Sequence, residues 1–106
     1  MNVIALPDIS PHFTQRVDLD GTSYLLELQW IQRESRWYFR LATEQDESII
    51  GLHKLVVDID LLRACVHARR PPGVLFALDT SGQGLKPGFD DLGVRVLICY
   101  SPANDV

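Results

Sequence analysis

The sequence predicts an all-β protein: a small antiparallel β-barrel or β-sandwich of six to seven strands with at most one short helical turn. Two observations predict this class. Apolar and polar residues alternate with period two in nearly every segment, and the segments are short and bounded by Gly, Pro and Asp turn signals. With 106 residues, 46% of them hydrophobic, the chain can build one core. We expect a single domain over 1–106, with an N-terminal strand or arm over 1–11 and a polar tail over 101–106.

The first predicted hairpin turns at Asp20-Gly21, because both residue types tolerate the positive φ that a tight type I′ turn requires. Before the turn, every second residue from Phe13 to Leu19 shares one face of a strand. After the turn, the same holds from Tyr24 to Trp30. We therefore expect two paired strands, each with one face in the core.

A third strand is predicted over 36–41, where Trp37 and Phe39 alternate with more polar residues and should be buried. The acidic segment 43–48 should form a loop. A further β-rich run covers 49–57, and Gly51 inside it indicates a bulge or bend.

The second half of the chain holds two more predicted strands. Residues 58–68 fit either an irregular strand or a helical turn, which we place near Leu61 to Ala64. The prolines and glycine of 69–73 end any regular element. Strands should follow over 74–79 and 94–100, separated by a glycine-rich loop over 80–88 that we expect to be exposed and mobile.

The composition argues against several classes of protein. A formal net charge of −4 argues against a nucleic-acid partner, because phosphate binding needs clustered Lys and Arg. No apolar run approaches the roughly 20 residues that a membrane-spanning helix needs, and the N-terminus lacks the features of a secretion signal. Cys65 and Cys99 stand among apolar neighbours, so we expect reduced thiols in the core.

Catalytic and metal-binding patterns are weak. Cys65 and His67 would provide only two of the three or four ligands of a zinc site. The glycine loop near Gly82 lacks the lysine and helix of a phosphate-binding loop. The weakest hypothesis is that the protein is an enzyme with Asp58, Asp60 and His53 as its catalytic residues. We expect no enzymatic activity, no metal and no cofactor, and we expect such Asp side chains to bind local backbone donors instead.

Tryptophan, tyrosine and arginine, the residue types enriched at protein interfaces, gather around the predicted hairpin over 24–41. Its outward side chains are equally typical of a solvated face. The two tryptophans, Trp30 and Trp37, also permit an alternative function, a carbohydrate-binding β-sandwich with stacking platforms. The candidate interface consists of Trp30, Arg33, Arg36, Tyr38, Arg40, Arg69 and Arg70.

An ordered series of residues covers the chain from about Phe13 to Tyr100. It comprises Leu19-Asp20-Gly21, Tyr24, Leu26, Leu28, Trp30, Arg33, Trp37-Tyr38, Ile50-Gly51, Leu55-Val56, Asp60-Leu61-Leu62, Pro72-Gly73, Leu75, Asp79, Asp91-Leu92-Gly93, Arg95 and Tyr100. This series resembles the phage baseplate plug family, small tail proteins of contractile-tailed phages. No single motif carries the resemblance, which depends on the order of the whole series.

The resemblance implies a structural, non-enzymatic protein of the virion, made in the host cytoplasm. It implies a place at the junction of tail tube and central hub, where the protein helps to close the lumen until infection. It also implies contacts with hub and tube-initiator proteins in three or six copies. Loops such as 43–48 and 80–88 would order when the protein docks.

Overall fold

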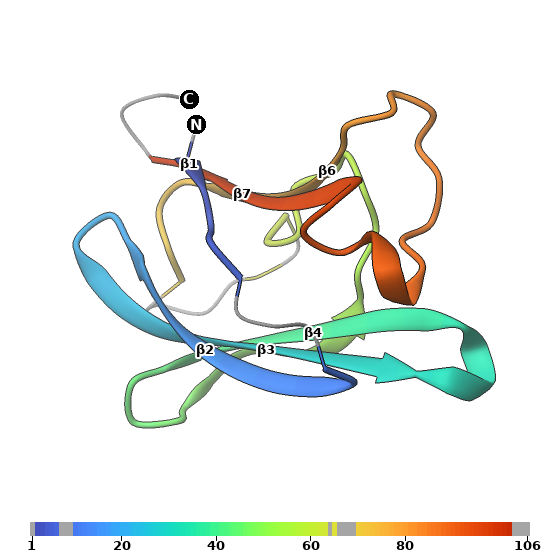
Figure 1. The fold of residues 1–106 in the computed structure, drawn as a ribbon. Helices are drawn as coiled ribbons and strands as arrows, with labels where there is room; N and C mark the ends of the chain where they lie inside the picture. Colours follow the sequence, from blue (N-terminus) through green and yellow to red (C-terminus); the bar gives the residue numbers. More distant parts are fainter. Residues whose placement is uncertain (1, 7–9, 64, 66–69, 103–106) are drawn as a thin grey trace.

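The computed structural model describes residues 2–6, 10–63, 65 and 70–102, and within these ranges seven strands form two antiparallel sheets (Figure 1). One sheet has the order β2-β3-β4-β5 and the other β1-β7-β6. The strands are β1 Asn2–Val3, β2 His12–Leu19, β3 Thr22–Ile31, β4 Arg36–Thr43, β5 Ser48–Lys54, β6 Val74–Asp79 and β7 Val96–Ser101. Two 3-10 turns, η1 Gln32–Glu34 and η2 Phe89–Asp91, complete the regular structure.

The two sheets face each other across one hydrophobic core and do not close into a barrel (Figure 1). The all-β prediction is therefore confirmed. Of the two architectures that the sequence left open, barrel and sandwich, the structure has the sandwich. The four-stranded sheet contributes Leu26, Leu28, Trp37, Phe39 and Leu41 to the core, and the three-stranded sheet contributes Leu75, Ala77, Val96, Ile98 and Tyr100.

The hairpin of β2 and β3 has the predicted two-residue turn. Asp20 has φ 54° and Gly21 has φ 81°, and Leu19 pairs with Thr22 across the turn. The predicted alternation is also confirmed, because Val17 and Leu19 on β2 and Tyr24 on β3 are buried. Burial of this face fixes the register, since a slip by one residue would move every apolar side chain into solvent.

Strand β5 is shorter than the predicted run over 49–57, and it contains the expected bulge. Phe39 pairs with His53 but Leu41 pairs with Ile50, so β5 carries an additional residue around Gly51. After Lys54 the chain turns toward the other sheet, where Val57 forms a parallel bridge with Ala77 of β6. The segment after β5 therefore covers the outer edge of β6, while β5 itself remains an edge strand.

Two predictions for the second half need correction. Near Leu61 the chain forms consecutive hydrogen-bonded turns, with Arg63 N donating to Asp60 O and Cys65 N donating to Leu62 O, instead of a regular helical turn; Ala64 lies outside the described residues. The last strand begins two residues later than we expected. Gly93 has φ 83° and Val94 N donates to Asp91 O, so a turn keeps Val94 out of the sheet and 77% exposed.

Candidate interaction surface

The outer face of β4 carries three of the predicted interface residues. Arg36, Tyr38 and Arg40 alternate with Trp37 and Phe39, which are buried, so the three side chains point away from the core. Each of the three is half-buried. The sequence pattern thus placed these residues on the correct face.

Arg40 and Tyr38 already have partners within the chain. Arg40 lies 3.0 Å from Asp46 Oδ1 and 3.4 Å from Glu27 Oε1, its cross-strand neighbour on β3. The Tyr38 hydroxyl donates to Glu34, and this hydrogen bond raises the pKa of the tyrosine. These contacts stabilise the sheet and leave less of either side chain for a partner.

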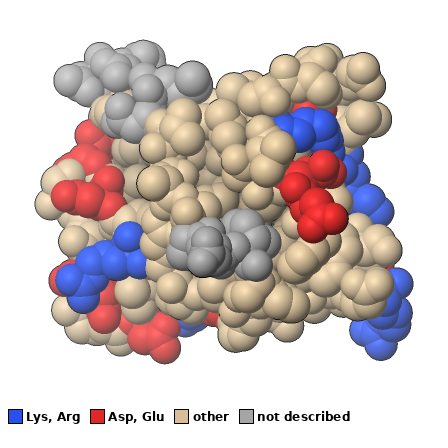
Figure 2. Space-filling model, in the orientation of Figure 1, with Lys and Arg blue, Asp and Glu red and all other residues tan. Residues whose placement is uncertain are grey.

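Arg33 and Arg36 differ from Arg40 in that neither forms an ion pair within the described ranges. Arg33 belongs to η1 and Arg36 begins β4, so both lie at the end of the sheet where β3 turns into β4. Basic side chains gather over this turn at the lower right of Figure 2. The turn is therefore the part of the predicted interface whose charge is most available to a partner.

The two tryptophans form an aromatic cluster with Phe89 of η2. The rings of Trp37 and Phe89 are stacked, 5.6 Å apart at an interplanar angle of 11°, and Trp30 packs edge-on against both. Trp37 is fully buried, and its Nε1 donates to Gly88 O at 3.1 Å. Trp37 therefore presents no ring face on which a sugar could stack, which removes half of the proposed carbohydrate platform.

The guanidinium group of Arg70 donates to backbone carbonyls of its own chain. Its Nη1 lies 2.9 Å from Leu62 O and 3.2 Å from Cys65 O, and its Nε donates to Pro71 O. Arg70 thus provides hydrogen-bond donors for the backbone carbonyl groups of the turns after Leu61. Its position beside two prolines did not predict this structural role. Arg69, the other predicted arginine of this segment, lies outside the described residues.

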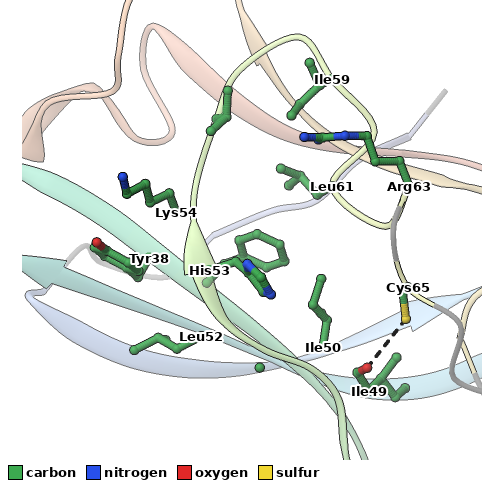
Figure 3. A pocket seen from close by; sticks show the side chains of 13 residues that line it. Tyr38, Ile49, Ile50, Leu52, His53, Lys54, Ile59, Leu61, Arg63 and Cys65 are labelled. Atoms are coloured by element: carbon green, nitrogen blue, oxygen red, sulfur yellow. Dashed lines mark hydrogen bonds between the residues drawn. The ribbon is translucent and has the colours of Figure 1, made fainter.

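An open groove of about 740 Å³ runs along the outer edge of β5 (Figure 3). One wall is β5 and the other is the segment of the turns, so residues 50–54 lie opposite 59–63. The sequence analysis missed this groove. Leu52 and Val56 mark it in the structure, because both side chains are large, hydrophobic and exposed, whereas the sequence shows only that they are apolar. The lining residues that matter below are Ile50, Leu52, Lys54, Val56, Ile59 and Arg63.

Several residues of the ordered series meet in an ion network beside the glycine-rich loop. Arg95 lies 2.9 Å from Asp79 and 2.9 Å from Asp91, and its hydrogen bond is the main cause that lowers the pKa of the Asp91 carboxyl group. The pKa of the Asp79 carboxyl group is also lowered. The strongest cause for Asp79 is the hydroxyl of Ser81, which donates at 2.7 Å. The side chain of Asp79 is fully buried and also accepts from Leu85 N, so it holds the start of the loop in place.

The acidic residues considered for catalysis bind backbone donors. Asp58 accepts from Asp79 N and Asp60 accepts from Leu62 N. Among the described residues, no group of three or more His, Cys, Asp or Glu could hold a metal ion. Cys65 is half-buried and Cys99 is buried; both are free, and burial raises the pKa of the Cys99 thiol. Within the described ranges, no helix is long and apolar enough to cross a membrane.

A comparison with protein-family models finds one that matches residues 1–103, described as the cyanophage baseplate Pam3 plug gp18. The match covers nearly all of the chain and agrees with the resemblance found in the ordered series. A search of curated proteins finds no match.

Proposed function

Since the chain belongs to the cyanophage baseplate plug family, a family of structural tail proteins, we propose that it helps to close the lumen where the tail tube meets the central hub. In this role it contacts hub and tube-initiator proteins in three or six copies and has no enzymatic activity. Family membership alone gives a location in the virion tail baseplate and association with other baseplate proteins. The single observation that carries the proposal is the family match over 1–103.

The shape of the molecule supports this role. A sandwich with one continuous core offers rigid surfaces, and its hydrogen-bonded loops give a defined outline (Figure 1). The acidic loop after β4 folds back on itself, because the backbone N–H of Thr43 donates a hydrogen bond to Glu47 O at 2.9 Å. A rigid domain loses little conformational entropy when it is built into an assembly.

The β3–β4 turn is the surface we assign to a neighbouring baseplate protein. Neither Arg33 nor Arg36 forms an ion pair with a carboxylate of the described residues. Arginine is enriched at the centre of protein interfaces because its guanidinium group makes several hydrogen bonds at once.

Quantitative mass spectrometry of purified particles from the source organism tests the proposal. The amount of this chain is measured against the tail-tube protein. A ratio of three or six copies per particle is the expected result. Absence of the chain from the particle would contradict a place in the baseplate.

Charge reversal tests the assigned surface. The double substitution Arg33→Glu with Arg36→Glu should reduce incorporation into particles, because the turn then repels an acidic partner surface. The matched control is Arg16→Glu with Lys86→Glu, which changes the net charge equally on exposed positions elsewhere. Equal incorporation of both double variants would show that the turn is not the contact.

A further inference from the structure

We propose that the groove along β5 binds an extended, acidic segment of another protein, which adds to the four-stranded sheet as a further strand. This inference rests on the proposed function for the identity of the neighbour but not for the binding itself. It assigns a second surface, distinct from the β3–β4 turn, and it specifies the conformation and charge of what binds there. Three features of the groove carry it: an open strand edge, apolar side chains along that edge, and a basic rim.

The first feature is the backbone of β5. Leu55 N donates to Trp37 O at 2.9 Å, and His53 lies opposite Phe39, so both residues direct their backbone groups toward β4. Backbone groups of successive residues in a strand point to opposite edges, so Lys54 directs its N–H and C=O away from β4 and toward the groove. An edge strand with such groups is a template for pairing with another chain.

The same orientation holds at the other end of β5. Ile49 O accepts a hydrogen bond from Cys65 Sγ at 3.5 Å, so this carbonyl also faces away from β4 (Figure 3). The contact joins the two walls at one end of the groove. An incoming strand would therefore occupy the stretch from Ile50 to Lys54, which is long enough for about four or five paired residues.

The second feature is the apolar lining. Leu52 is 46% exposed and Val56 is 39% exposed, whereas most large apolar side chains of this fold are buried. Ile50 and Ile59 extend this surface across the groove as half-buried residues. Side chains of this type form pockets for alternate residues of an added strand, because every second side chain of that strand points to the same face.

The third feature is the charge of the rim. Lys54 and Arg63 stand on opposite walls of the groove, and neither has an ion-pair partner among the described residues (Figure 3). The described lining residues include these two cations and His53 but no Asp or Glu, although the chain as a whole carries 14 acidic and 10 basic residues. The groove therefore complements an acidic ligand and not a second copy of this acidic chain.

Peptide binding to the isolated full chain, followed by amide NMR, tests the inference without any phage component. The probe is an end-blocked peptide of alternating glutamate and valine. We expect its chemical-shift changes to concentrate at Leu52, His53 and Lys54. A peptide with lysine in place of glutamate should bind clearly more weakly, because Lys54 and Arg63 would repel it.

Backbone pairing is tested with the wild-type protein, so that folding of a variant does not affect the result. The glutamate–valine peptide is methylated on alternate amide nitrogens, in both possible registers. Methylation of the amides that face β5 should abolish binding, and methylation of the opposite set should not. Equal binding of both methylated peptides would overturn strand addition.

Charge reversal identifies the site. Lys54→Glu with Arg63→Glu should lower the affinity for the glutamate–valine peptide by about tenfold, the effect of losing two exposed charge pairs. The control, Arg16→Glu with Lys86→Glu, should bind as the wild type does. Shift changes centred on Arg33 and Arg36, no change at β5 at millimolar peptide, or a dimer that forms through Leu52 in sedimentation would each overturn the proposal.

The result is independent of the particle measurement above. If the chain is absent from particles but the peptide binds at β5, the baseplate role fails and the groove stands. If the chain is present in particles but no peptide binds, the groove fails and the baseplate role stands.

Discussion

The hydroxyl group of Tyr100 donates a 2.6 Å hydrogen bond to the carboxylate of Asp20 and thereby joins the two sheets. Tyr100 belongs to β7, and Asp20 occupies the turn between β2 and β3. The same hydroxyl accepts a hydrogen bond from Gly73 N at 2.8 Å. Burial, and then the hydrogen bond to Asp20, raises the pKa of Tyr100, so the phenol remains protonated where it bridges these segments.

Removal of this hydroxyl should destabilise the fold. Tyr100→Phe leaves the buried Gly73 N–H without its acceptor and Asp20 without one donor, which should cost about 1–3 kcal/mol in the free energy of unfolding. Urea denaturation measures this loss. As a control, Tyr38→Phe removes a hydroxyl from the outer face of β4 and should change stability by no more than about 0.5 kcal/mol. A Tyr100→Phe variant as stable as the control would show that the bridge contributes nothing.

Gly73 is fixed by space and not by its backbone angle. A Cβ atom built at this position would clash with Ser101 O and lie 2.8 Å from the Tyr100 ring. Gly73→Ala must therefore shift β6 away from β7, at a cost of about 1–3 kcal/mol. Gly51→Ala is the matched control, because nothing lies within 4 Å of its Cβ position. Thermal melts that fall equally for both variants would contradict the steric explanation.

The aromatic cluster should contribute more than any single hydrogen bond. Trp37→Ala empties a fully buried site and should cost about 3–5 kcal/mol, whereas the half-buried Trp30 should cost less when replaced by Ala. Trp37→Phe keeps most of the packing but loses the bond to Gly88 O, so its effect should lie between wild type and Trp37→Ala. Urea denaturation of the three variants measures this order. A melt of Trp37→Ala that does not move would contradict the assignment of Trp37 to the core.

The sequence predicted the parts of this fold that depend on local periodicity. The alternation from Tyr24 to Trp30 and the Asp20-Gly21 turn depend only on residues close together in the sequence. They therefore predicted the two strands, the face of each that is buried and the register of the hairpin. The resemblance also identified Asp20 and Tyr100 as members of one series. Their contact could not be predicted, because it joins residues 80 positions apart through the packing of two sheets.

The candidate site shows the same division. Period two placed Arg36, Tyr38 and Arg40 on the outer face, but it gave no information about which of them has a partner. Arg40 is paired because the acidic loop folds back and brings Asp46 to it. The groove along β5 was missed because its two walls, a strand and a turn segment, are brought together by tertiary packing, which the residue pattern of neither segment shows. The exposure of Leu52 and Val56 is visible only in the structure, and an exposed apolar residue by itself is ordinary.

Acid should unfold the protein through the ion network of Asp79, Asp91 and Arg95. The pKa values of both carboxyl groups are lowered in the folded state, so the network contributes its full stability above the unfolded carboxyl pKa of about 4. That contribution is lost as the pH falls from there toward the folded values, because the unfolded chain then binds protons that the folded chain does not.

Urea denaturation at about pH 7, 5 and 3 measures the effect, because these pH values lie above and below the pKa of an ordinary carboxyl group. Asp79→Asn has no carboxylate at this position, so it should be less stable than wild type at neutral pH and should lose less on acidification. Asp18→Asn, an exposed position on β2, should retain the wild-type loss. If the wild type and Asp79→Asn lose the same free energy between neutral and acidic pH, the buried carboxylate of Asp79 is not the acid-sensitive contact. A smaller loss confined to Asp79→Asn would instead identify Asp79 as the group whose protonation weakens the contacts with Ser81, Leu85 N and Arg95.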